Sequence, residues 1–201
     1  LLVACIGAGL DKQVTLSKFD ELVELGETSY SLSYHHYYPN AIVPDPEANN
    51  VEPCFSQTFH PQWNYNCEDL AIEKEVMMLN GKNSVMVRYT LKSARSGNVK
   101  LRLRPLMAFR SFHHVARTND CFNFEYDKAA TGFQIQPYED SLKLKFELSE
   151  NAVIEPDRAW YKSFRFIEEE KRGYPSEEDL ACVADISLNL EIDKPVYILA
   201  S

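Results

Sequence analysis

The chain of 201 residues has little glycine, and it lacks the motifs that mark most enzyme active sites. With only seven glycines, it contains neither the G-x-x-x-x-G-K-[ST] loop nor the G-x-G-x-x-G loop that cradle phosphate groups. The G-x-S-x-G turn of serine hydrolases and the H-E-x-x-H zinc motif are also missing. No apolar run approaches the roughly 18 residues that a transmembrane helix needs. Nothing in the sequence therefore specifies a complete active site or a membrane span.

Positive charge is also scarce, because 21 Lys and Arg residues stand against 30 Asp and Glu residues, for a formal net charge of −9. Nucleic acids and anionic membrane surfaces are bound mainly through Lys and Arg, so the acidic excess counts against both partners. The shares of hydrophobic residues, 45%, and charged residues, 25%, are typical of a folded globular chain. Because no internal repeat or convincing linker interrupts the chain, we expect one domain over residues 1–201.

Five cysteines occur, with no C-x-x-C pair among them. The missing pair excludes a zinc ribbon and a thioredoxin-type redox site. An odd number of cysteines, in a chain long enough to build its own core, is typical of reduced, buried thiols in a cytoplasmic protein. A small loop closed by Cys54 and Cys67 remains an alternative. Residues 1–6 are too short for the apolar region of a signal peptide and are typical of the second half of a strand, so we expect the chain to be cut from a longer protein.

Alternation of apolar and polar residues, the period of a half-buried strand, dominates the chain. Across residues 141–148 it places four apolar side chains on one face, those of Leu142, Leu144, Phe146 and Leu148. Besides the first six residues, strands are expected at 13–25, 30–35, 54–60, 72–79, 85–91, 100–104, 122–126, 133–136, 141–148, 187–192 and 195–199.

Helical signals are few by comparison. The segment 163–172 could form a helix of one or two turns, ended by Gly173-Tyr174-Pro175. Asn80-Gly81 favours a β-hairpin between the strands that flank it, and the proline-containing stretch 39–53 is expected to be a surface loop. About a dozen short strands without helical connections predict an all-β fold, a large antiparallel β-sandwich of two sheets.

Arg110, His113 and His114 follow an alternating strand directly, so we expect them at the strand end or in the next loop. Adjacent side chains on a strand point to opposite faces, so only one of the two histidines could serve a given site. That weakens a metal-binding interpretation, because metal ligands must converge. Histidines bonded to the backbone or exposed to solvent are the simpler alternative. A metal-dependent enzyme would use His35, His60 and His113 with a carboxylate.

Two pairs of aromatic residues are candidates for carbohydrate binding. Trp63 with Tyr65, and Trp160 with Tyr161, could stack on the C–H faces of sugar rings while neighbouring polar groups bind the hydroxyls. The alternative is packing in the core or at a domain interface, because large aromatic residues dominate cores of this size.

Two runs of acidic residues, 168–170 and 177–179, could supply the paired carboxylates that glycoside hydrolases use as acid and as base or nucleophile. Sequence gives no separation between the carboxylates, and a run of acidic residues is usually a solvated face. The solvated face is therefore the favoured interpretation.

Several short segments, in this order along the chain, resemble one protein family. They are LLVA at 1–4, VTLSKFDEL at 14–22, LRLRPL at 101–106, FR at 109–110, HH at 113–114, WY at 160–161, EKRG at 170–173 and EDL at 178–180. Their order and spacing resemble the N-terminal domain of bacterial and archaeal glycogen debranching enzymes of the amylo-α-1,6-glucosidase type, over nearly the whole chain. The chain departs from that pattern at Ser111, where the family favours an acidic residue, and it lacks the family's glycine-rich start.

The resemblance implies a β-sandwich that precedes an all-helical (α/α)6 toroid, and this toroid carries the acids that hydrolyse α-1,6 branch points. The present sequence shows no series of long amphipathic helices. The resemblance therefore implies a non-catalytic module, truncated at both ends and without a cofactor, of a cytoplasmic glycoside hydrolase. Its expected partners are the catalytic domain of the same polypeptide and an α-glucan, glycogen or limit dextrin. The candidates for the domain interface or a sugar-facing loop are Arg110, His113, His114, Trp160, Tyr161 and Arg172.

Two other functions remain open. An autonomous carbohydrate-binding module would expose Trp63 and Tyr65, or Trp160 and Tyr161, on one platform. A small metal-dependent β-fold enzyme would use the histidines named above. The sequence leaves open the strand order, the oligomeric state, the exact glucan, and which histidine or aromatic side chains face the substrate.

Overall fold

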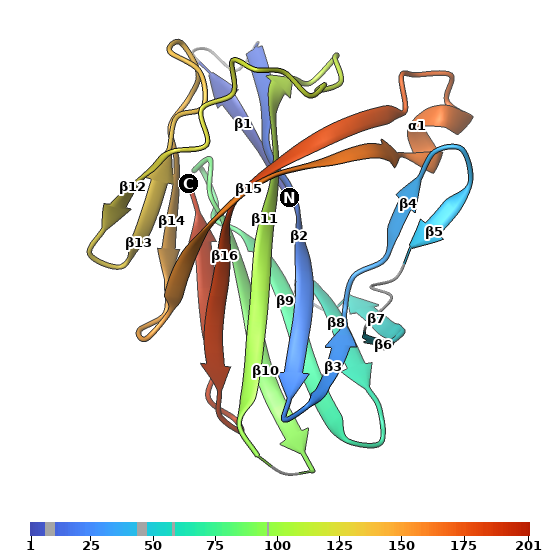
Figure 1. The fold of residues 1–201 in the computed structure, drawn as a ribbon, viewed down its shortest axis with the longest axis vertical. Helices are drawn as coiled ribbons and strands as arrows, with labels where there is room; N and C mark the ends of the chain where they lie inside the picture. The colour runs from blue at the N-terminus through green and yellow to red at the C-terminus, as the bar shows by residue number, and fades with distance from the viewer. Residues whose placement is uncertain (7–10, 44–47, 58, 96) are drawn as a thin grey trace.

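The computed structural model of the protein describes residues 1–6, 11–43, 48–57, 59–95 and 97–201. Two β-sheets lie face to face and form a sandwich (Figure 1). Nearly all neighbouring strands are antiparallel, and one short pair at the edge of the first sheet is parallel. The all-β sandwich predicted from the alternation is therefore confirmed.

The first sheet, which we call sheet A, has nine strands. In spatial order they are β5 (Ala41–Val43), β4 (His35–Tyr37), β15 (Val153–Arg165), β16 (Glu177–Leu190), β11 (Val99–Ser111), β2 (Asp11–Leu25), β3 (Thr28–Ser31) and β6 (Asn49–Asn50), with β1 (Leu2–Ile6) also paired to β2.

The second sheet, sheet B, has eight strands. In spatial order they are β12 (Tyr126–Ala129), β13 (Gly132–Ile135), β14 (Leu144–Leu148), β17 (Val196–Ala200), β10 (Val85–Ala94), β9 (Leu70–Met78), β8 (Pro61–Asn66) and β7 (Pro53–Gln57). One helix, α1 (Ile167–Lys171), lies between β15 and β16 in the chain.

The main core lies between the two sheets and follows from the alternation. Leu101 and Leu103 on β11 point inward and have no exposed surface. On sheet B, Phe133 stacks on Phe146 with the ring centroids 4.7 Å apart. Burial of one large apolar side chain stabilises a fold by roughly 1.5–3 kcal/mol, so these faces hold the sheets together.

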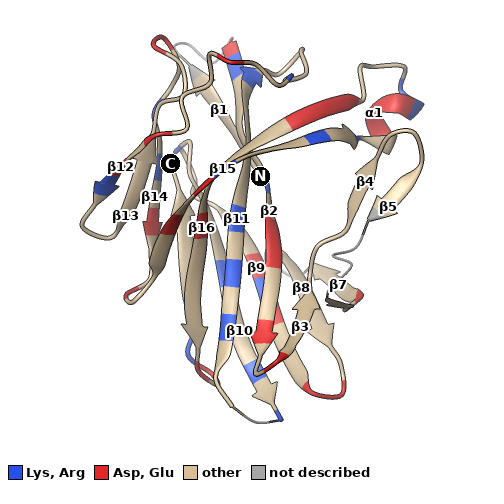
Figure 2. Cartoon of the chain, viewed as in Figure 1, with Lys and Arg blue, Asp and Glu red and all other residues tan. Residues whose placement is uncertain are grey.

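The outer face of sheet A carries ordered charge. Arg102 and Arg104 alternate with the inward leucines of β11, and Figure 2 shows their strand beside acidic positions on β2. Arg102 donates to Glu24 of β2 over 3.1 Å and also pairs with Asp185 of β16. Arg104 donates to the same Asp185 over 3.1 Å. These ion pairs tie three neighbouring strands together on the solvent side.

A second, smaller core covers the end of this outer face. Leu180 and Cys182 of β16 pack there with Leu106 and Ala108 of β11 and with Phe164 of β15. Strand β16 is consequently buried on both faces at this point, which ordinary alternation does not produce.

Sheet A curves so strongly that β4 comes back against the outer face of β2, and this curvature, which we call the roll of sheet A, explains the second core. Three strands, β15, β16 and β11, separate β4 from β2 in the sheet order, yet the side chains of β4 and β2 meet. Lys18 of β2 donates to the Nδ1 atom of His35 over 2.8 Å and to the carbonyl oxygen of Tyr34 over 3.1 Å. The Nε2 atom of His35 lies 2.9 Å from Asp20, also on β2. Because Lys18 can only donate, Nδ1 accepts and the Nε2–H group donates to Asp20.

Several local expectations need correction. The expected helix at 163–172 is shorter, because β15 continues to Arg165 and only α1 is helical. The expected strand at 122–126 is instead β12, which begins at Tyr126. The stretch 39–53 is not all loop, because β5 and β6 lie in it, while residues 44–47 lie outside the described residues. Cys54 and Cys67 are free thiols, so the alternative of a small disulfide loop is wrong. The expected burial of the thiols holds for Cys182 and is wrong for Cys5, Cys54 and Cys121, which are exposed.

Helix α1 has only five residues. Over the ranges that the structure describes, no helix is long and apolar enough to cross a membrane.

Candidate functional site

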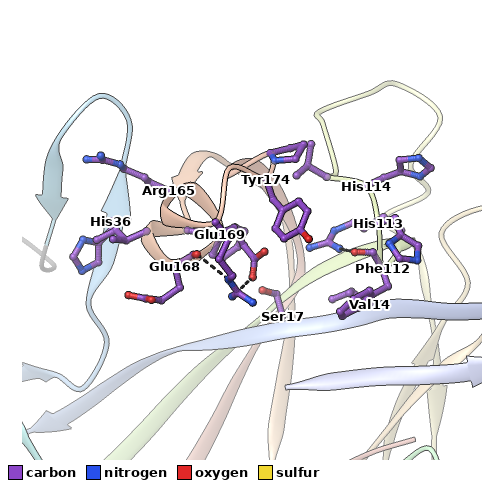
Figure 3. Close-up of a pocket in the computed structure, with 16 residues that line it drawn as sticks. Val14, Ser17, His36, Phe112, His113, His114, Arg165, Glu168, Glu169 and Tyr174 are labelled. Atoms are coloured by element: carbon purple, nitrogen blue, oxygen red, sulfur yellow. Dashed lines mark hydrogen bonds and ion pairs between the residues drawn. The ribbon is translucent and has the colours of Figure 1, made fainter.

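A cavity of about 820 Å³ opens at the end of sheet A, where β2, β11 and β15 approach α1. Its lining includes Val14 of β2, together with Arg110 and Phe112 at the end of β11 and just after it. Val14 and Phe166, the residue before α1, also pack on the second core. That core therefore forms the floor of the cavity, which we call the end pocket. Figure 3 shows the α1 side and the β11 side facing each other across it.

Arg110 is held by a buried ion pair. Its guanidinium binds both carboxylate oxygens of Glu178, with 3.1 Å between Nη2 and Oε2, and Glu178 has no exposed surface. Glu178 also accepts a hydrogen bond from the backbone N–H of Ala116 over 2.8 Å. The Nη1 atom of Arg110 donates to the carbonyl oxygens of Ser111 and Phe112. Arg110 therefore fixes the wall of the end pocket that follows β11.

Asp179, the neighbour of Glu178, fixes the same wall from the other side of β16. It accepts hydrogen bonds from the backbone N–H and the hydroxyl of Thr118, each over 2.9 Å, and from the backbone N–H of Ser163 over 2.8 Å. Burial raises the pKa of Asp179, but the hydrogen bonds from Thr118 and Ser163 outweigh it and leave the pKa below its usual value. The carboxylates of Glu178 and Asp179 thus bind donor groups of the fold itself, so the expectation of a solvated face is wrong for these two residues of the run 177–179.

The opposite wall of the end pocket is α1 with its flanking residues. Arg172 donates from Nη2 to Glu169 over 2.7 Å and from Nε to the carbonyl oxygen of Glu168 over 3.0 Å (Figure 3). Arg165 pairs with Glu170 over 2.8 Å. The arginines that line the pocket are therefore already matched with carboxylates.

Exposed rings and imidazoles line the space between these walls. Strand β11 ends at Ser111, so His113 and His114 lie in the turn after it, and both line the end pocket. Their expected place in the loop after the strand is confirmed, so the argument that adjacent residues on a strand point to opposite faces does not apply to them. Phe112 is 52% exposed and Tyr174 is 61% exposed, and neither was singled out from the sequence. The pocket brings together four of the predicted candidates, Arg110, His113, His114 and Arg172.

Trp160 and Tyr161 do not line the end pocket. Trp160 packs edge-on against Phe122 and Phe124, with ring centroids 5.2 and 5.9 Å apart, at the margin of the main core. Tyr161 points to the opposite side of β15, packs on the second core and accepts a hydrogen bond from Arg104 over 3.4 Å. Burial raises the pKa of Tyr161. The pair therefore supports two different cores rather than one platform.

Trp63 and Tyr65 share the inward face of β8, because residues two apart on a strand point the same way. Tyr65 is only 4% exposed, so its assignment as a glucan-stacking residue is wrong in this structure. Trp63 is half-buried between Phe55 and Lys74. The ring centroids of Trp63 and Phe55 are 5.3 Å apart, and the Nζ atom of Lys74 lies 5.5 Å from the Trp63 ring centroid.

The three histidines of the metal-enzyme interpretation are held in separate places. His35 bonds to Asp20, His60 bonds to Glu75 over 2.7 Å, and His113 lies at the end pocket. In the part of the chain that the structure describes, no three His, Cys, Asp or Glu side chains are placed to hold a metal ion.

Comparison with known proteins places the chain in one family. The family model described as "Glycogen debranching enzyme N terminal" matches residues 1–197. No curated protein matches the chain. Among solved structures, a bacterial glucoamylase complexed with acarbose matches with a TM-score of 0.49 and 12% sequence identity, over 95% of this chain and 27% of that chain. The chain thus spans about a quarter of the length of that glucoamylase. Because the family model extends over nearly all of its residues, the chain belongs to the glycogen debranching enzyme N-terminal family.

Proposed function

We propose that this chain is the non-catalytic β-sandwich domain, a single domain over residues 1–201, of a cytoplasmic glycogen debranching enzyme with α-1,6-glucosidase activity. It packs against an (α/α)6 catalytic domain of the same polypeptide, and the substrate of the whole enzyme is an α-glucan such as glycogen or limit dextrin. Family membership supports the domain role, and five free thiols are consistent with a reducing compartment.

The observation that carries the non-catalytic role is the state of Glu178 and Asp179. A glycoside hydrolase needs one carboxyl group that can donate a proton and a second that can act as base or nucleophile. Glu178 is buried against Arg110, and Asp179 is saturated by three donors. Neither carboxylate can approach a glycosidic bond without breaking the fold around it.

The end pocket is the face that we assign to the rest of the enzyme or to its glucan. The predicted candidates Arg110, His113, His114 and Arg172 gather there with two exposed rings. Aromatic and arginine side chains are enriched where proteins bind partners, which supports this assignment.

The test is hydrolysis of limit dextrin by two samples, the 201-residue chain and the polypeptide encoded by the complete gene. We expect the chain alone to release no glucose and the complete polypeptide to release it. Removal of residues 1–201 from the complete polypeptide should lower its thermal stability, because the surface that this domain covers becomes exposed. Glucose release by the chain alone, or a gene without a long helical segment after Ser201, would overturn the proposal.

A second candidate function is an autonomous carbohydrate-binding module. The exposed rings of Phe112 and Tyr174 beside a pocket favour it, although the platforms expected at Trp63 and Trp160 are half-buried. A module of this kind would bind glucan equally well with and without the catalytic domain, and a complete gene that encodes no catalytic domain would favour it.

A further inference from the structure

We propose that the end pocket binds a neutral oligosaccharide, a short segment of α-glucan chain, through stacking on Phe112 and Tyr174. This inference rests on the proposed function and names the ligand of the same site. It assigns to the domain a glucan contact of its own, separate from bond cleavage.

The size and position of the pocket fit such a ligand. Its volume of about 820 Å³ falls within the range of roughly 300–1,000 Å³ that is usual for ligand sites. It opens at the end of the rolled part of sheet A, and Val14 and Phe166 give it an apolar floor. A sugar ring has apolar C–H faces and polar edges, so it needs both an apolar surface and hydrogen-bonding groups.

The charge of the lining selects a neutral ligand. Each lining arginine is already bound to a carboxylate, as the site geometry shows, and these pairs are Arg110 with Glu178, Arg165 with Glu170, and Arg172 with Glu169. A phosphate or an acidic peptide would have to compete with these carboxylates for the guanidinium groups. A neutral sugar can instead bind the edges of the existing pairs without breaking them.

Two rings are available for stacking. Phe112 follows β11 and Tyr174 follows α1, so they come from the two walls of the pocket. Figure 3 shows Tyr174 pointing into the space toward the side of Phe112 and His113. More than half of each side chain is exposed, so ring faces remain free for a ligand.

The remaining polar groups match hydroxyl groups. Among the described residues, the side chains of His113 and His114 have no hydrogen-bond partner, and a neutral imidazole offers one donor and one acceptor. Glu168 adds carboxylate oxygens as acceptors, and its hydrogen bond from Lys171 holds its pKa below the usual value. Each sugar hydroxyl both donates and accepts, so this mixed set suits it.

The wall beneath Phe112 is held in place before any ligand arrives. Ala116 is tied to Glu178, and Thr118 is tied to Asp179 by two hydrogen bonds. Because this wall is already ordered, less conformational entropy is lost when a ligand binds.

The test is calorimetric titration of the 201-residue chain with maltoheptaose. We expect a dissociation constant of about 1 mM or tighter. Phe112→Ala and Tyr174→Ala should each weaken binding about tenfold, while Tyr174→Phe, which keeps the ring, should stay close to the original affinity. The matched control is Phe55→Ala, because Phe55 is 55% exposed but lies on β7, beside Trp63. Melting curves of all variants should coincide with that of the original chain, since the replaced side chains are exposed.

Three results would overturn the inference. They are the absence of maltoheptaose binding, loss of binding in Phe55→Ala but not in the pocket variants, and displacement of maltoheptaose by inorganic phosphate at equal concentration. The proposed function is judged separately, by glucose release from limit dextrin. A chain that binds no sugar while the complete polypeptide still cleaves limit dextrin would remove only this inference.

Discussion

The buried pair of Arg110 and Glu178 supports a quantitative prediction about stability. Arg110→Met removes the cation and leaves a carboxylate with no exposed surface. Breaking a buried ion pair by removing one partner destabilises a protein by roughly 3–5 kcal/mol, because the remaining charge is uncompensated. For a chain of this length, 1 kcal/mol corresponds to roughly 2–4 °C, so we predict a fall in Tm of about 6–20 °C.

The two partners should not be equivalent. Glu178→Gln leaves a guanidinium that is 18% exposed at the end pocket and can reach water, so its cost should be smaller than that of Arg110→Met. The double variant Arg110→Met with Glu178→Met should be more stable than Arg110→Met alone, because it leaves no buried charge. A double-mutant cycle measures this coupling directly.

The measurement is urea denaturation at pH 7, followed by far-UV circular dichroism and tryptophan fluorescence. An exposed ion pair, Arg158 with Glu125, provides the matched control, since both side chains are more than half exposed. Arg158→Met should cost less than about 1 kcal/mol. If Arg110→Met cost no more than this control, or if the double variant were the least stable of the set, the reasoning from burial would be refuted.

Three further predictions follow from single positions. Gly132→Ala should destabilise the chain by more than about 1 kcal/mol in urea denaturation, because φ is +154° and a Cβ would lie 2.0 Å from the carbonyl oxygen of Phe146; an unchanged midpoint would contradict this. Burial raises the pKa of Asp20, but the hydrogen bond from His35 and the nearby charges of Arg104 and Lys18 together outweigh it, and the pKa is lowered. The stability that Asp20 contributes is therefore present above its unfolded pKa of about 3.9 and is lost as the pH falls through the lower native pKa. Asp20→Asn should therefore reduce this loss of stability at acid pH, measured by denaturation curves across this pH range. An unchanged pH dependence would count against the contribution of Asp20 to stability. Burial also raises the pKa of the Cys182 thiol, so a thiol reagent should modify the three exposed cysteines quickly and Cys182 only after unfolding; fast reaction of Cys182 in the native chain would argue against its burial.

Much of the fold could be predicted because strand periodicity is local. The alternation around Phe146 and around Leu101 gives the inward face without knowledge of the partner strand, and both residues are buried as expected. The resemblance of short segments likewise identified the family, because a family pattern is itself a property of the linear sequence.

Local rules failed where distant segments meet. His113 and His114 were assigned opposite faces, but β11 ends before them and both reach the end pocket. Tyr65 was expected on a binding platform, yet the sandwich buries it. The side of a strand that becomes buried depends on which sheet closes over it, and periodicity alone does not tell one face of β8 from the other.

The sequence by itself determined that this protein is an all-β chain of the glycogen debranching enzyme N-terminal family, since strand patterns and family segments lie in consecutive residues. The tertiary structure alone decided what the charges do. From the sequence alone, Glu178 and Asp179 look like part of a solvent-exposed acidic run. Only the fold brings Arg110, 68 residues from Glu178, and the loop after β11 into contact with them. Burial and pairing are properties of contacts between distant residues, and for that reason the end pocket and the ion pairs of its arginines became visible only in the folded chain.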